Sequence, residues 1–539
     1  MRNAKERKGV GWISIVVALL ITSHLTPITS FAQTFRHGGC MPDVTESSVA
    51  DGLPDGSSTA HGAQAPRRLP PINKNWNPEK TYKQAVILMT FSDLGFSIDT
   101  PRETYHRIFN EQNYNENLGP GCFVDYFRDQ SNGMLNMECD IYGPYQVSSK
   151  AQPYENPTED THNYGKTQML EAVKQWIAEN PELDYKQYDW NGNGTVNQVI
   201  FVYAGFSGNE NKASCYGYIW PNTGTLSTTV TAPDGTRISD YTSSAELWSN
   251  NKSCGIGTIC HEFTHSLGLP DIYPTNGVAY STVDEWDLMD GGNFTNYGWC
   301  PPNYTPLEKM LLGWLTPTEL TEPTTVSNLA TVDNGGVVFL VKNTTNEYYL
   351  LENRQWQGWD AGLPGKGLVV YHVNYNASSW GNNSVNNKRN AYRFHLIAAD
   401  NRDYDSWYDY IKGSGLSQYA NKNRMNSRVF SDAPYPFVTE TDSLINELTD
   451  TSVPAAIVYN VNADGTLFMG KAITDIKQNE DGTVSFLFMG GIPSDVHVSV
   501  FGIQNSELRE GIFDLQGRRI YGTPSRGLVI KNGRKMMVR

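Results

Sequence analysis

The sequence has little positive charge and no long apolar segments, and these two features argue against nucleic-acid-binding and membrane-spanning proteins. It contains 42 Lys and Arg residues against 57 Asp and Glu residues, which gives a formal net charge of −15. Because an acidic surface repels phosphate backbones, we expect no nucleic-acid partner. No apolar run reaches the roughly 20 residues that a membrane-spanning helix requires. We therefore expect no transmembrane segment.

The N-terminus predicts export. A basic stretch, Arg2–Lys8, precedes the apolar run Trp12–Ile21, and small residues at Ser30 and Ala32 form a plausible cleavage site. A buried N-terminal helix is the alternative, but it does not explain this order of features. We expect residues 1–32 to be a signal peptide, and the protein to be secreted or held at the cell surface.

Export permits disulfide bonds, and the cysteines are numerous enough to form them. Of seven cysteines, Cys40 lies alone near the start of the exported chain. The other six fall in one central region and can form three disulfides, whose pairing the sequence does not determine. They are Cys122, Cys139, Cys215, Cys254, Cys260 and Cys300.

The first half of the chain has two kinds of sequence. Residues 33–80 are rich in Gly, Pro, Ser and Ala without periodicity, as in a linker or pro-segment. Residues 81–316 combine short apolar runs typical of buried strands, such as Ala85–Phe91, with helical spacing of apolar residues in Thr167–Asn180. We expect an α/β catalytic domain there.

The second half is expected to be rich in β-structure. Residues 317–490 contain short alternating stretches separated by Asn and Gly turns, which favour a β-sandwich accessory region. Residues 491–539 contain two strand-like pieces around Gly turns and end in basic residues. The predicted fold class of the whole chain is α+β.

The strongest chemical signal is the segment CHEFTHSLGLPDIY, from Cys260 to Tyr273. On a helix, His261 and His265 lie one turn apart on one face and can fill two corners of a tetrahedral zinc site. Glu262 lies beside them and can accept a proton from zinc-bound water, as a general base. A histidine pair without a metal is the plainer alternative, and the Gly and Asp that follow argue against it.

A catalytic zinc site needs a third protein ligand and keeps one position open for water. Gly268 can adopt a left-handed conformation that ends the helix, so that the chain turns back and Asp271 reaches the metal. The alternative ligand is Glu285, twenty residues beyond His265. Gly268 favours Asp271, because an uninterrupted helix would carry that residue past the metal.

A set of linked motifs resembles one family. The segment EWDLMDGGNF places Met289 before a Gly pair, as in the methionine turn beneath the metal of metzincin peptidases. Together with HEFTHSLGLPDIY, YTPLEKMLLGWL and EYYLLENRQWQGWDAGLPGKGLVVYHV, it resembles secreted bacterial metallopeptidases of the immune inhibitor A type. The resemblance extends from about Ala85 to Gly490.

The resemblance implies a metzincin-like α/β catalytic domain, an inhibitory pro-segment and β-rich domains after the catalytic one. It also implies zinc-dependent hydrolysis of peptide bonds in protein or peptide substrates. Carried over by position, it assigns His261, His265 and Asp271 to zinc, Glu262 to the general base and Met289 to the methionine turn.

The resemblance leaves the group that stabilises the oxyanion open. Metzincins often have a tyrosine two residues after the turn methionine, but this sequence has Gly291 there. Tyr297 is the candidate that we name for this role.

A second cation site is suggested by the segment YDWNGNGTVNQV, a feature also found in the family. Asp189, Asn191, Asn193 and Asn197, with the Thr195 carbonyl, alternate as in an EF-hand-like calcium loop. Asparagines replace the usual aspartates, so we expect weak affinity for calcium. An Asx-rich turn before a strand explains the pattern equally well.

Two further segments suggest transport and latency. The C-terminal GIFDLQGRRIYGTPSRGLVIKNGRKMMVR is similar to sorting domains of the type IX secretion system, with a short β-hairpin as the alternative. CMPD at Cys40 loosely resembles the cysteine switch of matrix metalloproteinases. Its thiolate could fill the open zinc position, and a free or dimer-forming thiol is the alternative.

The sequence thus predicts a secreted zinc metalloendopeptidase. The alternative from another class is a surface adhesin or glycan-binding protein whose metallopeptidase-like domain is not catalytic. A metal hydrolase that acts on non-peptide bonds is a third reading, against which only the family resemblance argues.

Overall fold

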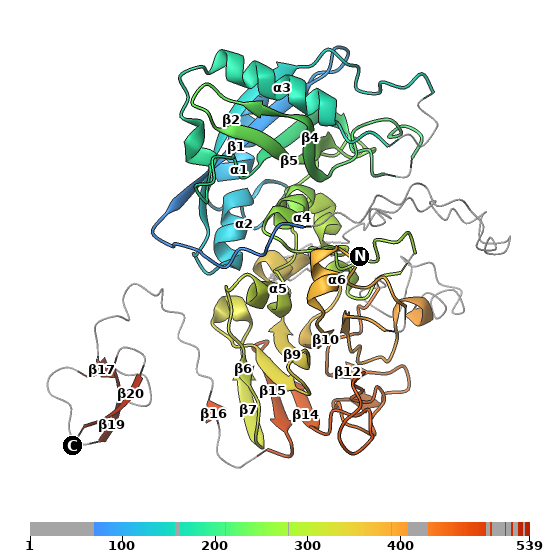
Figure 1. Cartoon of the computed structure of the whole chain (residues 1–539). Coiled ribbons are helices and arrows are strands. Elements are labelled where there is room, and N and C mark those ends of the chain that lie inside the picture. The colour runs from blue at the N-terminus through green and yellow to red at the C-terminus, as the bar shows by residue number, and fades with distance from the viewer. Residues whose placement is uncertain are drawn as a thin grey trace, which may run out of the picture.

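The computed structural model shows an α+β fold, as predicted (Figure 1). The first sheet and α3 lie at the top of Figure 1, the later sheets lie at the bottom, and helix α4 lies between them. The structure describes residues 69–156, 162–210, 212–278, 280–389, 391–407 and 429–491, and short strands beyond residue 491.

The first sheet has five strands in the order β2-β1-β3-β5-β4. Four strands are parallel to their neighbours, and only the edge strand β4 is antiparallel. Because both faces of a parallel sheet are covered, β1 and β3 have nearly unbroken apolar sequences. The bounds are β1 Thr81–Thr90, β2 Asn136–Gln146, β3 Val199–Phe206, β4 Thr223–Thr231 and β5 Arg237–Leu247.

Helices cover both faces of this sheet. One face is covered by helices α1, α2 and α4, and the other by α3, with a separate apolar core on each side. The bounds are α1 Pro101–Asn110, α2 Phe123–Gln130, α3 Lys166–Glu179 and α4 Gly257–Ser266. The sequence predicted α3 and α4, because both have apolar residues at helical spacing.

The later region is a sandwich of two sheets that share one apolar core. The strand orders are β11-β10-β9-β8-β6 and β14-β15-β7-β16. The bounds are β6 Thr318–Glu319, β7 Thr324–Leu329, β8 Phe339–Lys342, β9 Glu347–Arg354, β10 Gly367–Asn374, β11 Phe394–Leu396, β14 Ile473–Gln478, β15 Val484–Phe488 and β16 Val496–His497.

The sheet that contains β9 is buried on both faces. Along β9, Tyr349 and Leu351 face the second sheet of the sandwich, while Tyr348 and Leu350 belong to the core that also contains the apolar side of α4. The β-rich region and the helix with the two histidines are therefore packed together through one core.

The remaining elements are short. The helices are α5 Pro306–Leu311 and α6 Ala377–Gly381, and the 3-10 helices are η1 Glu116–Leu118, η2 Tyr185–Tyr188, η3 Asp284–Trp286, η4 Gly292–Gly298, η5 Val332–Asn334 and η6 Gly358–Gly362. The strands are the pair β12 Phe437–Val438 and β13 Leu444–Ile445, and the tail strands β17 Ile512–Phe513, β18 Arg519–Ile520, β19 Gly527–Lys531 and β20 Arg534–Val538. The tail strands pair in the order β18-β17-β19-β20.

The end of the expected pro-segment is packed against the fold. Asn73 donates its backbone N–H to the carbonyl of Leu267 at 3.2 Å, and the indole of Trp76 donates to the carbonyl of Leu312 at 2.8 Å. Leu69 is buried and donates its N–H to the carbonyl of Gly381. Residues 69–76 thus form hydrogen bonds both to the end of α4 and to the end of α6.

The disulfide prediction is wrong for the cysteines that the structure describes. All six cysteines of the central region are free and buried. They pack as small apolar side chains, and burial raises the pKa of Cys260 well above that of an ordinary thiol. The number of cysteines suggested disulfide bonds, but each of these side chains instead fills space in an apolar core. Cys40 lies outside the described residues.

Among the described helices, none is both long enough and apolar enough to cross a bilayer.

Candidate metal centre

Helix α4 is held in place by burial of its apolar side and by a sharp end. Phe263 is fully buried against Phe123 and Phe127 of α2, with ring centroids 5.4 and 4.9 Å apart. The helix stops at Gly268, whose φ of +98° lies in the left-handed region. Glycine adopts this conformation at low cost, so the chain can turn back toward the helix.

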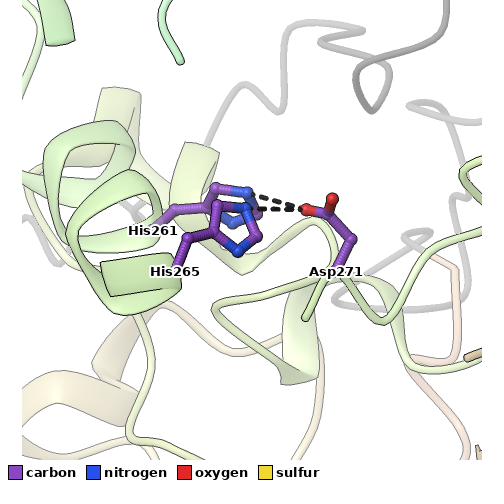
Figure 2. A group of neighbouring side chains, drawn as sticks. All are labelled: His261, His265 and Asp271. Atoms are coloured by element: carbon purple, nitrogen blue, oxygen red, sulfur yellow. Dashed lines mark ion pairs between the residues drawn. The ribbon is translucent and has the colours of Figure 1, made fainter. Parts of the chain in front are cut away.

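That turn brings three side chains together. His261 Nε2 lies 3.1 Å and His265 Nε2 lies 3.2 Å from the same oxygen, Asp271 Oδ1 (Figure 2). Figure 2 shows the two imidazoles leaving α4 side by side while the carboxylate meets them from the following loop. All three residues are buried, and among the described residues they form the only cluster with metal-ligand geometry.

Backbone carbonyls fix the imidazole rings. The Nδ1 atom of His261 lies 2.8 Å from the carbonyl oxygen of Leu288, and that of His265 lies 2.8 Å from the carbonyl oxygen of Leu269. A carbonyl accepts only, so each Nδ1 carries the proton and donates it. The Nε2 lone pairs are then left facing Asp271, which is the tautomer that a metal needs.

The charges of the cluster are strongly coupled. Burial alone would lower the pKa of His261, but the neighbouring carboxylates of Asp271 and Glu262 outweigh it and raise the pKa to about 9. Burial would raise the pKa of Asp271, and the two histidines hold it well below its usual range instead. The two imidazoles thus favour the ionised form of Asp271.

The donor set fits zinc. Two ligand atoms about 2.0–2.1 Å from a tetrahedral zinc lie roughly 3.3 Å apart, close to both distances found here. Asp271 Oδ1 is buried and accepts no hydrogen bond, so a metal ion would satisfy it. Glu285, the alternative ligand, is outside the cluster. The geometry favours Asp271.

Glu262 lies beside the cluster and is contacted by the edge strand β4. The hydroxyl of Thr223 is 3.1 Å from Glu262 Oε2 and also contacts the Glu262 backbone carbonyl. Burial raises the pKa of the Glu262 carboxyl. A carboxylate with a raised pKa next to a metal site is suited to accept and return a proton.

The segment around Met289 lies under His261. Leu288 supplies the carbonyl that orients the His261 ring, and Met289 is fully buried. The Met289 carbonyl accepts the N–H of Ile272 at 2.8 Å, which ties this turn to the residue after Asp271. The turn therefore supports a histidine and the carboxylate at the same time.

Tyr297, our candidate for stabilising the oxyanion, is in contact with Lys252. Its ring lies under the Lys252 ammonium, 4.0 Å away. Tyr273 is the tyrosine at the site: burial and the neighbouring Asp271 and Glu262 carboxylates raise the pKa of its hydroxyl, and its ring stacks on that of His261 with the centroids 6.2 Å apart. The sequence patterns gave Tyr273 no role, although it is the last residue of the quoted motif.

The expected calcium loop is closed by its own hydrogen bonds. The Asp189 carboxylate accepts N–H groups of Gly192 and Gly194, at 2.8 and 2.6 Å. Asn193 Oδ1 accepts the N–H of Thr195, at 2.9 Å. Asn191 and Asn197 likewise accept backbone N–H groups. These contacts describe an Asx-rich turn, and calcium binding stays a prediction.

Residues 77–309 match the catalytic domain of immune inhibitor A peptidase M6. Over 273 residues the chain is 26% identical to the protein named immune inhibitor A of Bacillus thuringiensis subsp. alesti, which corresponds to 42% of this chain and 39% of that relative. The chain thus matches less than half the length of the relative. These similarities confirm the resemblance that the motifs indicated over residues 77–309, which are similar to the catalytic domain of immune inhibitor A peptidases.

Proposed function

We propose that the protein is a secreted zinc endopeptidase that cleaves peptide bonds in protein substrates. One observation carries the proposal: His261, His265 and Asp271 converge on one point with their metal-binding atoms free. The match of residues 77–309 to a peptidase family supports the reaction class. The expected signal peptide, residues 1–32, supports export.

The roles of the residues follow from their positions. His261, His265 and Asp271 would hold the zinc, which supplies a water of pKa roughly 7 and polarises the scissile carbonyl. Glu262 accepts the proton of the attacking water and returns it to the departing amine. Thr223 holds the Glu262 carboxylate against β4. Tyr273, whose ring stacks on that of His261, would donate its hydroxyl proton to the oxygen on which charge develops.

Three finer assignments belong to the same proposal. The Cys40 thiolate would fill the open zinc position before activation, residues 491–539 would serve as a type IX sorting domain, and Asp189 with its neighbouring asparagines would bind calcium weakly. Each rests on the sequence patterns described above.

The test is casein hydrolysis by the purified protein. We expect activity that is lost on zinc chelation, restored by added zinc, and reduced by at least about 10³-fold in Glu262→Ala, since the general base and the metal act together. A protein that retains zinc but cleaves no protein or peptide would instead favour the adhesin reading. Activity that persists in Glu262→Ala would contradict the proposed mechanism.

A further inference from the structure

We propose that Asn383, in the β-rich region, is a positioning residue for the metal ligand Asp271. This inference rests on the proposed metal site. It adds that the site is completed from a part of the chain 112 residues further along. The β-rich region then contributes to the metal affinity of the site in the peptidase domain.

Two hydrogen bonds join the residues. The side-chain amide of Asn383 donates from Nδ2 to Asp271 Oδ2 at 2.7 Å, and the backbone N–H of Asp271 donates to Asn383 Oδ1, also at 2.7 Å. The amide nitrogen and the amide oxygen of Asn383 therefore both form hydrogen bonds with Asp271. An aspartate in its place could not do this, because a carboxylate accepts hydrogen bonds but cannot donate them.

The pairing selects which carboxylate oxygen is available. With Oδ2 bound to the amide of Asn383, the carboxylate cannot rotate freely, and Oδ1 is directed at the two imidazoles. Oδ1 is the buried oxygen that accepts no hydrogen bond. Asn383 thus prepares Asp271 to offer one oxygen to a metal, as outer hydrogen-bond partners of metal ligands commonly do.

Asparagine is also suited to the backbone at this position. Asn383 follows helix α6 and has a φ of +52°, in the left-handed region that asparagine tolerates better than most residues. Its carbonyl accepts the hydroxyl of Thr275 at 2.6 Å, so its backbone is fixed to the same loop that its side chain contacts.

Neighbouring asparagines extend the contact along the loop without reaching the ligand. Asn387 Oδ1 accepts the N–H of Thr275 at 2.7 Å, and Asn386 Nδ2 donates to the carbonyl of Ile272 at 2.9 Å. These residues hold the loop, whereas Asn383 alone of the three contacts Asp271 itself. This difference provides a matched control.

The experiment measures zinc affinity of the full chain by competition with a chromogenic chelator. Asn383→Gly keeps the left-handed backbone but removes the carboxamide, and Asn383→Asp keeps the acceptor but removes the donor. We expect both to bind zinc about 10–100-fold more weakly than the wild type. Asn387→Ala, which loosens the same loop, should stay within about threefold.

Two further readouts separate positioning from general destabilisation. Unfolding temperatures of the metal-free proteins should fall about as much in Asn387→Ala as in Asn383→Gly, and the absorption spectrum of the Co²⁺ form should change only in the Asn383 variants. The inference is overturned if Asn383→Gly and Asn387→Ala have the same zinc affinity and Co²⁺ spectrum. A failure of the proposed function is distinguishable, because then His261→Ala would also leave zinc binding unchanged.

Discussion

Gly268 and Ile72 lie so close that a Cβ atom at position 268 would clash with the backbone of Ile72. A Cβ placed on Gly268 would be 2.7 Å from Ile72 Cα and 2.9 Å from the carbonyl oxygen of Pro70. The glycine therefore has two roles: it turns the chain toward Asp271, and it makes room for residues 69–76. The end of the metal-binding helix is covered by this segment.

The first prediction concerns Gly268→Ala. We expect it to lower the free energy of unfolding by more than the roughly 1–3 kcal/mol of a strained backbone, because the contact with Ile72 adds to it. Gly277→Ala is the control, since Gly277 has a φ of +80° but open space around it. Urea unfolding measures both, and equal losses in the two variants would argue against the packing role.

The second prediction concerns Thr223, which contacts the Glu262 carboxylate from β4. Thr223→Val removes the hydroxyl, and we expect kcat to fall about 3–10-fold, as for one lost hydrogen bond of about 0.5–1.5 kcal/mol. Thr223→Ser keeps the hydroxyl and should restore most of the rate. Steady-state peptide hydrolysis measures both. If serine were as slow as valine, the hydroxyl would not be the reason.

The third prediction distinguishes two tyrosines. Tyr273→Phe removes the hydroxyl beside the Asp271 carboxylate, and we expect kcat to fall by about 10²-fold, as for the loss of an oxyanion donor. Tyr297→Phe should leave kcat unchanged, because its ring lies under Lys252. Zinc content is measured in both, to show that the metal is retained. The reverse order of effects would restore Tyr297 as the donor.

The fourth prediction concerns pH. Asp287 and Glu308 are two buried carboxyl groups that interact with each other, and burial raises the pKa of Asp287 well above its usual range and that of Glu308 to about 7. The pair holds a proton in the folded protein that the unfolded chain releases near pH 4.5. Its stabilising effect is therefore present below about pH 4.5 and is lost as the pH rises through about 7.

Glu308→Gln removes the carboxyl whose pKa is raised to about 7 and should weaken this dependence. Denaturant unfolding of the metal-free proteins from pH 4 to pH 8 measures it. We expect the wild type to lose up to about 3 kcal/mol relative to the variant as the pH rises. If the free energies of unfolding of the two proteins changed in parallel with pH, Glu308 would not titrate with a raised pKa.

Local patterns predicted the parts of the fold and site that depend on local geometry. His261 and His265 were found because a helix places residues four apart on one face, and Gly268 indicated the turn that brings Asp271 back. Strands β1 and β3 were found because their apolar runs are unbroken. The signal in each case lies within a few neighbouring residues.

The missed parts depend on tertiary packing. Strand β5 has buried Thr242, Ser243 and Ser244, polar residues that give no apolar run, although the strand lies inside the sheet beneath α4. Asn383 is 112 residues from the ligand that it contacts, and no short motif connects the two. The six central cysteines were expected to form disulfides but are free, because a count carries no information on position.

The most direct test of the metal site is a crystal of the protein grown with zinc and measured at the zinc absorption edge. We predict one strong anomalous peak about 2.0–2.2 Å from His261 Nε2, His265 Nε2 and Asp271 Oδ1. A peak that includes Glu285 in place of Asp271, or no peak at the two histidines, would contradict the account.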